Sequence, residues 1–147
     1  MINELFIIKQ LQQIKIKELM ILLSIPFHSI IYILLIILLY LNNKINYNNF
    51  ILLIFGQLLI YIIKNNIKRT RPFIIDKKIK NFEIMYIDDY SFPSGHTFNA
   101  FLLFYIFKYN SIIPYLVGLS RIYLGVHYPS DVISGALLAK ICYNLIN

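Results

Sequence analysis

The feature that most constrains this chain is a run of 22 residues without a charged side chain, from Met20 to Leu41. A helix rises about 1.5 Å per residue, so this run is long enough to cross a hydrocarbon core about 30 Å thick. Pro26 and His28 interrupt it near one end, where neighbouring helices or lipid headgroups can satisfy the freed polar groups. The run therefore predicts a kinked transmembrane span, in which we assign His28 no catalytic role.

Composition supports a membrane protein with a single domain. Hydrophobic residues make up 59% of the 147 residues and charged residues 14%, which is more apolar than soluble domains usually are. A chain of this length forms one domain, so we expect a single membrane-embedded domain over 1–147 with one active site. The net charge of +7 is scattered between apolar runs, so we expect anionic lipid headgroups, and not nucleic acid, as partners.

Four shorter apolar runs follow the first one, at about 50–63, 97–109, 111–125 and 131–146. The last three need tilt or local thinning of the bilayer to cross it. We therefore expect an all-α, multi-pass integral-membrane bundle of about five transmembrane helices. Residues 3–18 repeat apolar side chains at helical spacing between polar ones, which is typical of a helix in the membrane interface. An ordinary extension outside the membrane is the alternative for that segment.

Five crossings place three polar clusters on the same membrane face. That face receives the end of the second and fourth spans and the start of the third and fifth, and the clusters fall at those points. In the order of the chain they are Lys64-x6-Arg71-Pro72, Pro93-Ser94-Gly95-His96 and Ser120-Arg121-x5-His127-x3-Asp131.

The three clusters together resemble the signature of the type 2 phosphatidic acid phosphatase family, which includes the vanadium haloperoxidases. The resemblance covers 64–131, and the motifs match at their defining positions and in the family's order. It implies a membrane phosphatase that acts on a lipid phosphate or diphosphate and needs no metal and no other cofactor. Undecaprenyl diphosphate, phosphatidylglycerol phosphate and phosphatidic acid are the substrate types that the resemblance suggests.

The residue types suit phosphoryl transfer independently of the family. The transferring group spreads negative charge over its oxygens and needs fixed donors, which Lys64, Arg71 and Arg121 can supply. Arginine can hold two phosphate oxygens with its planar fork, whereas lysine offers a point charge. Ser94 and Gly95 stand just before the third expected span, where a helix N-terminus favours an anion. We therefore predict a phosphate site formed by these five residues.

His127 and Asp131 are four residues apart, which on a helix places them on one face. The carboxylate can then hold one imidazole nitrogen protonated and leave the other free to attack. By resemblance to the family, His127 attacks phosphorus and Asp131 orients it. His96 protonates the leaving oxygen and then helps water to hydrolyse the phosphohistidine.

Three other interpretations remain open at this point. His96, His127 and Asp131 have plausible spacing for a divalent metal, although three nearby cations would repel the ion. The chain can also be a non-catalytic membrane protein that binds lipid phosphates, or a haloperoxidase-like protein that holds vanadate. The oligomeric state and the membrane side of the site stay undetermined. A final set of residues is most simply a solvated loop of mixed charge, namely Asp76, Lys77, Lys78, Lys80, Asp88 and Asp89.

Overall fold

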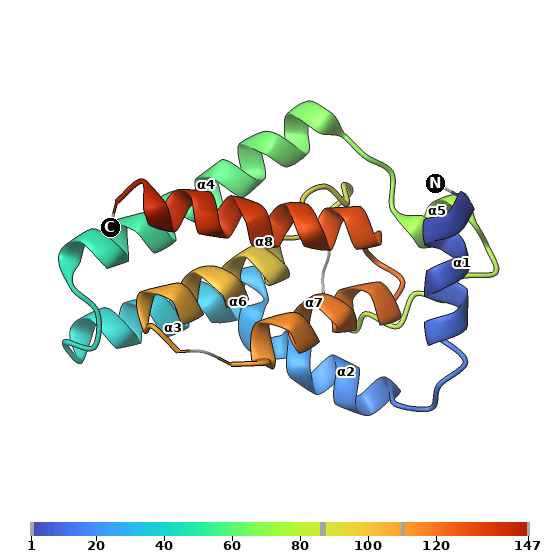
Figure 1. Cartoon of the computed structure of the whole chain (residues 1–147), viewed down its shortest axis with the longest axis horizontal. Helices are drawn as coiled ribbons and strands as arrows, with labels where there is room; N and C mark the ends of the chain where they lie inside the picture. Colours follow the sequence, from blue (N-terminus) through green and yellow to red (C-terminus); the bar gives the residue numbers. More distant parts are fainter. Residues whose placement is uncertain (1, 86–87, 110, 147) are drawn as a thin grey trace.

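The computed structural model describes residues 2–85, 88–109 and 111–146. Every regular element in these ranges is helical, which confirms the predicted all-α fold (Figure 1). The elements are α1 (Ile2–Leu11), α2 (Lys17–Ser24), the 3-10 helix η1 (Ile25–Phe27), α3 (Ser29–Leu41), α4 (Tyr47–Ile67), α5 (Pro72–Ile75), α6 (Gly95–Ile106), α7 (Ile113–Tyr123) and α8 (Pro129–Asn144).

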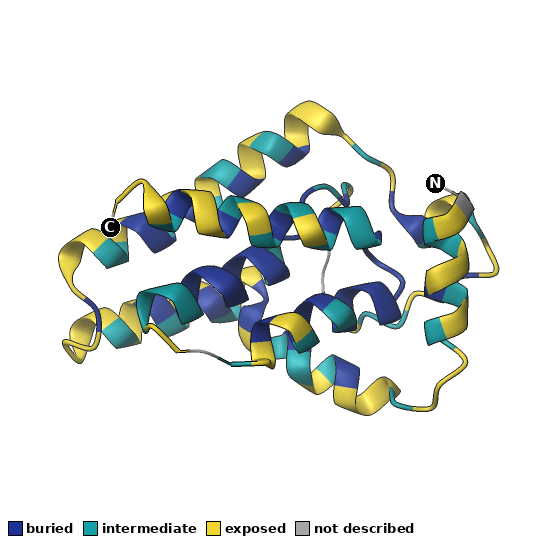
Figure 2. Ribbon diagram, viewed as in Figure 1, coloured by how far each residue is buried: buried dark blue, intermediate teal, exposed yellow. Residues whose placement is uncertain are grey.

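Helix α6 is the centre of the molecule. It packs against α3, α4, α7 and α8, and its residues Phe98 and Leu102 have no exposed surface. Figure 2 shows the same pattern, with buried residues concentrated on α6 and α7 and exposed ones along the outer helices. Helix α8 lies close to α6 because Gly135 has no side chain: a Cβ there would come 2.6 Å from the carbonyl oxygen of Ser94. This contact fixes the start of α6, where the second motif lies.

The first predicted span is broken, as Pro26 and His28 indicate. Residues 17–27 and 29–41 form two helical arms that meet at 52°, and only together do they have the length and hydropathy of a crossing. Among the described helices, α4 alone meets that test by itself. Helices α6, α7 and α8 have 12, 11 and 16 residues, fewer than the about 20 that an untilted span needs.

The predicted helix over 3–18 is too long, because α1 ends at Leu11 and the chain turns before α2. The side chain of Gln12 explains the turn, since it is fixed by the backbone of distant segments. Its Nε2 donates to the carbonyl oxygens of Lys80 at 2.7 Å and of Tyr123 at 2.9 Å, and its Oε1 accepts from the Lys80 amide. Helix α1 thereby covers the end of the bundle where the motifs meet (Figure 1).

Candidate active site

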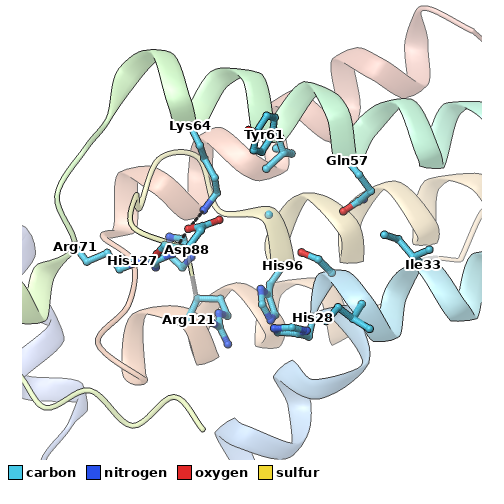
Figure 3. A pocket seen from close by; sticks show the side chains of 14 residues that line it. His28, Ile33, Gln57, Tyr61, Lys64, Arg71, Asp88, His96, Arg121 and His127 are labelled. Atoms are coloured by element: carbon cyan, nitrogen blue, oxygen red, sulfur yellow. Dashed lines mark hydrogen bonds and ion pairs between the residues drawn. The ribbon is translucent and has the colours of Figure 1, made fainter. Parts of the chain in front are cut away.

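The three polar clusters, far apart in the sequence, meet around one pocket with a volume of about 360 Å³. Helices α3, α4, α6 and α7 and the segments before α5 and α8 contribute to its wall (Figure 3). Six of the eight predicted site residues line this pocket: Lys64, Arg71, Gly95, His96, Arg121 and His127. The fold thus brings these six residues together in one pocket although they come from different helices and loops.

Lys64 and Arg71 converge on one carboxylate. Both are buried, with 7% and 2% of their surfaces exposed. The Lys64 Nζ donates to Asp88 Oδ1 at 2.9 Å and to the carbonyl oxygen of Tyr90 at 2.8 Å. Arg71 pairs with the same Asp88 oxygen through Nη2 and donates to the carbonyl oxygen of Val126 through Nη1 at 2.8 Å. Asp88 therefore bridges two of the three predicted phosphate-binding cations.

The third cation, Arg121, has its own carboxylate. Its side chain is fully buried, and Nη2 forms an ion pair with Oε2 of Glu83, whose side chain is 3% exposed. Glu83 and Asp88 come from the loop between α5 and α6, which the sequence indicated to be solvated. The Asp88 side chain is half exposed, as that interpretation predicts, but it also pairs with two buried cations, and sequence reasoning did not single out Glu83. The physical reason is that buried cations need a counter-charge close by.

Both carboxyl groups remain ionised in this setting. Burial raises the pKa of Asp88, but the charges of Lys64 and Arg71 and their hydrogen bonds outweigh it, so the pKa lies below its usual range. Burial likewise raises the pKa of Glu83, but the charge of the neighbouring Arg121 outweighs this effect, so the pKa of Glu83 also lies below its usual range. Two ionised carboxylates thus supply the counter-charge for these three cations.

His127 lies in the turn before α8 and not on a helix, so the predicted helical register with Asp131 is wrong. The two side chains still meet, with His127 Nδ1 at 3.5 Å from Asp131 Oδ2. The contact arises because Asp131, in the first turn of α8, accepts a hydrogen bond from the Tyr128 amide at 2.9 Å. Burial, reinforced by Arg71, Lys64 and Arg121, lowers the pKa of His127 well below its ordinary value. The lowered pKa favours the neutral imidazole, which is the form that the predicted role of His127 as a nucleophile requires.

Asp131 is held from behind by a network that the sequence did not reveal. Its Oδ1 accepts from Arg69 Nη1 at 2.6 Å, and the Arg69 guanidinium lies 3.9 Å from the Tyr128 ring centre. Arg69 also pairs with Glu4 of α1 at 3.0 Å, and Glu4 accepts from the Ser130 amide at 2.8 Å. Arg69 could have been predicted as a residue of the site, because it stands two residues before Arg71. Nothing in the sequence near Glu4 indicates its contact with Arg69.

The second motif forms the N-terminus of α6. Gly95 and His96 are its first two residues and line the pocket. Ser94 is fully buried and does not line it; its hydroxyl caps the helix, accepting from the Thr97 amide at 3.4 Å. His28, which received no catalytic role, lies in the same pocket with its ring edge to face with that of His96, the centroids 5.8 Å apart.

The described residues contain no group of three or more His, Cys, Asp or Glu side chains arranged to hold a metal ion.

Comparison with known proteins gives a consistent assignment at the family level. The model of the PAP2 superfamily matches residues 46–146, which include all three motifs. Phosphatidylglycerophosphatase B of Bacillus subtilis is 31% identical over 116 residues, covering 65% of this chain and 54% of that protein. The bacitracin transport permease protein BcrC of Bacillus licheniformis is 47% identical over 58 residues, covering 34% of this chain and 29% of that protein. The matches thus span about half or less of the length of these curated relatives.

Two solved structures share the fold. The transmembrane PAP2-type phosphatidylglycerolphosphate phosphatase of Bacillus subtilis superposes with a TM-score of 0.77 at 24% identity, covering 98% of this chain and 82% of that one. The LpxE of Aquifex aeolicus superposes with a TM-score of 0.80 at 21% identity, covering 97% of this chain and 93% of that one. At these identities the likeness establishes the fold.

Proposed function

The chain belongs to the PAP2 superfamily, and we propose that it removes phosphate from a lipid phosphate or diphosphate through a covalent phosphohistidine. The observation that carries the proposal is one pocket that joins a neutral, carboxylate-oriented histidine to a second histidine and three buried cations. These are the parts that nucleophilic phosphoryl transfer needs: a nucleophile, a proton donor and fixed positive charge.

In the first step His127 attacks phosphorus. Its Nδ1 faces Asp131, so Nε2 is the attacking nitrogen and the carboxylate stabilises the positive charge that the ring acquires. His96 donates a proton to the leaving oxygen as the P–O bond breaks. In the second step His96 takes a proton from water, which attacks the phosphohistidine and releases inorganic phosphate.

The substrate phosphate binds where the two loop carboxylates lie in the resting protein. Its oxygens exchange with those of Asp88 and Glu83 on Lys64, Arg71 and Arg121. Asp88 is suited to this exchange because half of its side-chain surface is exposed. The N-terminus of α6 adds the backbone N–H groups at Gly95 and the favourable end of the helix dipole, with Ser94 contributing as the cap. With these donors in place, the reaction requires no metal ion.

We propose that 1–147 forms one membrane-embedded domain that crosses the bilayer about five times. The support is the large number of apolar side chains exposed on the outer helices, since soluble proteins rarely expose large apolar patches to water. These side chains include Ile30, Leu34, Leu38, Phe55, Leu58, Ile133, Leu137 and Ile141. The shorter helices α6 and α7 cross by tilting or by thinning the bilayer locally.

The substrate is an anionic lipid with a terminal phosphate. The names of the relatives favour phosphatidylglycerol phosphate; undecaprenyl diphosphate and phosphatidic acid present the same terminal group to the same cations. Membrane lipids surround the protein, and the apolar end of the pocket, formed by Ile30, Ile33 and Ile60, takes the start of the lipid tail.

The test is phosphate release by detergent-purified protein from these lipids in excess EDTA, with His127→Ala as the matched control. Release by the wild type alone supports metal-independent catalysis through His127. Release that EDTA abolishes overturns the metal-free mechanism. Lipid phosphate binding that survives His127→Ala, without release by the wild type, replaces the enzyme by a non-catalytic lipid phosphate-binding protein.

A further inference from the structure

Arg69 is a cation at the site that the mechanism above does not use. Neither Arg69 nor its partner Glu4 lines the pocket. The Arg69 guanidinium instead reaches Asp131 from the side away from the pocket, with Nη1 at 2.6 Å from Oδ1. The three cations of the phosphate site pair with the loop carboxylates and not with Asp131. Arg69 can therefore affect the reaction only through the residues that it contacts.

Asp131 needs a counter-charge to stay ionised. Its side chain is fully buried, and its Oδ2 faces His127 Nδ1 at 3.5 Å. Burial disfavours an ionised carboxyl group unless a cation lies close to it. Among the residues that the structure describes, Arg69 is the one Lys or Arg side chain within ion-pair distance of Asp131. The other groups beside the carboxylate, the Tyr128 amide and the Ser91 hydroxyl, are neutral. Arg69 therefore favours the ionised form that the orientation of His127 requires.

Arg69 also fixes the segment that follows His127. Its Nη1 donates to Ser130 Oγ at 2.6 Å, and its guanidinium lies 3.9 Å from the centre of the Tyr128 ring. The backbone of Arg69 is anchored in turn, because its carbonyl oxygen accepts from the Ser91 amide at 2.8 Å. The position of the first turn of α8 relative to His127 therefore depends on this one side chain.

Glu4 of α1 holds the other end of the guanidinium. Its Oε2 pairs with Arg69 Nη2 at 3.0 Å, and its Oε1 accepts from the Ser130 amide at 2.8 Å. Carboxylates on both terminal nitrogens fix the orientation of a side chain that is otherwise long and flexible. Helix α1 lies outside residues 46–146, which the family model matches. This support for Asp131 thus comes from a segment outside the matched region.

We propose, on the basis of the phosphatase function proposed above, that Arg69 is a positioning residue for the pair His127 and Asp131, and that Glu4 holds Arg69 in place. When His127 forms its bond to phosphorus, the ring gains positive charge, which Asp131 stabilises only if it is ionised and correctly placed. Arg69 maintains both conditions and transfers no proton. Helix α1 thereby raises the rate of the reaction without contacting the substrate.

The test measures the rate constant of phosphate release in single turnovers, with saturating enzyme in excess over the lipid. Phosphatidylglycerol phosphate, undecaprenyl diphosphate and phosphatidic acid are compared first, and the one that the wild type hydrolyses fastest is used. Under these conditions the rate constant does not depend on the fraction of protein that is folded. Arg69→Met should lower it by about tenfold or more, because a hydrogen-bonded counter-charge is lost. The steady-state KM should change by less than about twofold, because Arg69 does not line the pocket.

A double-mutant cycle separates an effect through Asp131 from a general structural one. Asp131→Asn removes the charge that Arg69 supports, so adding Arg69→Met to it should lower the rate constant by less than about a further twofold. Arg69→Lys keeps the positive charge and should recover part of the activity that Arg69→Met loses. Losses that multiply in the double variant overturn the proposal, as does an Arg69→Lys variant that is no faster than Arg69→Met.

The contribution of α1 has its own matched pair of variants. Glu4→Gln should lower the same rate constant by about two- to fivefold, since the pair is partly exposed. Lys9→Gln removes another ion pair of α1, with Asp76, and should leave the rate constant unchanged. Equal slowing in the two variants would overturn the role of Glu4, because α1 would then act by its packing alone. No release by the wild type from any of the lipids refutes the phosphatase function itself, whereas release at the same rate by wild type and Arg69→Met refutes only the positioning role.

Discussion

Replacing Asp88 by asparagine tests whether a loop carboxylate competes with phosphate for the cations of the site. Asp88 Oδ1 contacts the Lys64 Nζ at 2.9 Å and also pairs with Arg71. Hydrogen bonds between charged groups contribute about 1.5–3 kcal/mol when shielded from water. The Asp88 side chain is 50% exposed, so we discount the two contacts to about 1 kcal/mol together. Asp88→Asn removes the competing charge, and inhibition by inorganic phosphate should become about fivefold stronger.

The assay is the inhibition constant of inorganic phosphate against hydrolysis of a lipid phosphate, together with the unfolding temperature without phosphate. The unfolding temperature should fall, because Lys64 and Arg71 lose their counter-charge. Asp89→Asn is the control: it makes the same change next door, where the described residues show no ion pair, and should alter neither quantity. An inhibition constant that is unchanged or larger in Asp88→Asn would show that Asp88 orders the cations instead of competing with phosphate.

Three further substitutions have expected outcomes. Arg71→Lys should lower kcat/KM by roughly tenfold or more, because lysine cannot keep the Val126 contact and also grip phosphate with a planar fork; an activity near wild type would contradict this. Glu4→Gln should reduce stability by less than about 1 kcal/mol at neutral pH. Burial raises the pKa of Glu4, but hydrogen bonds from Ser130 and the charge of Arg69 lower it overall. The wild-type advantage should therefore be complete above the unfolded value of 4.5 and vanish as pH falls through the lower folded value, in unfolding curves of both proteins. Gly125→Ala should destabilise the protein by about 1–3 kcal/mol, because Gly125 has φ +79° and a Cβ would collide with the Lys80 carbonyl; unchanged thermal unfolding would refute it.

The residues of the three motifs could be predicted from the sequence because each motif places its polar residues only a few positions apart. Arg71, Gly95, His96 and His127 reach the pocket from positions that the sequence already marked. The hydropathy pattern also predicted the break near Pro26, whereas the count of about five spans stays a prediction, because among the described helices only α4 and the bent pair over 17–41 have the length and hydropathy of a crossing. The helices in the structure begin and end a few residues away from the predicted apolar runs, because capping residues and turns, and not hydropathy, end a helix. Helix α4, for example, continues past Lys64 to Ile67.

The counter-charges were not predictable for a physical reason. Asp88 and Glu83 lie in an irregular loop, where no helical or strand period relates a side chain to the residues it meets. Their mixed-charge surroundings match those of any solvated loop. Glu4 is separated from Arg69 by 65 residues, so only the tertiary fold joins them. The need of buried cations for counter-charge was the one general signal that acids of this loop would pair with them.

The most direct test of the central claim is to identify the phosphorylated residue during turnover. The protein is mixed with a lipid phosphate labelled in its terminal phosphate, quenched with alkali within one turnover, and digested for mass spectrometry. We expect an acid-labile phosphoryl group on the imidazole of His127, absent from His127→Ala. Label on another residue, or phosphate release in a single turnover without any protein-bound phosphoryl group, would contradict the proposed mechanism.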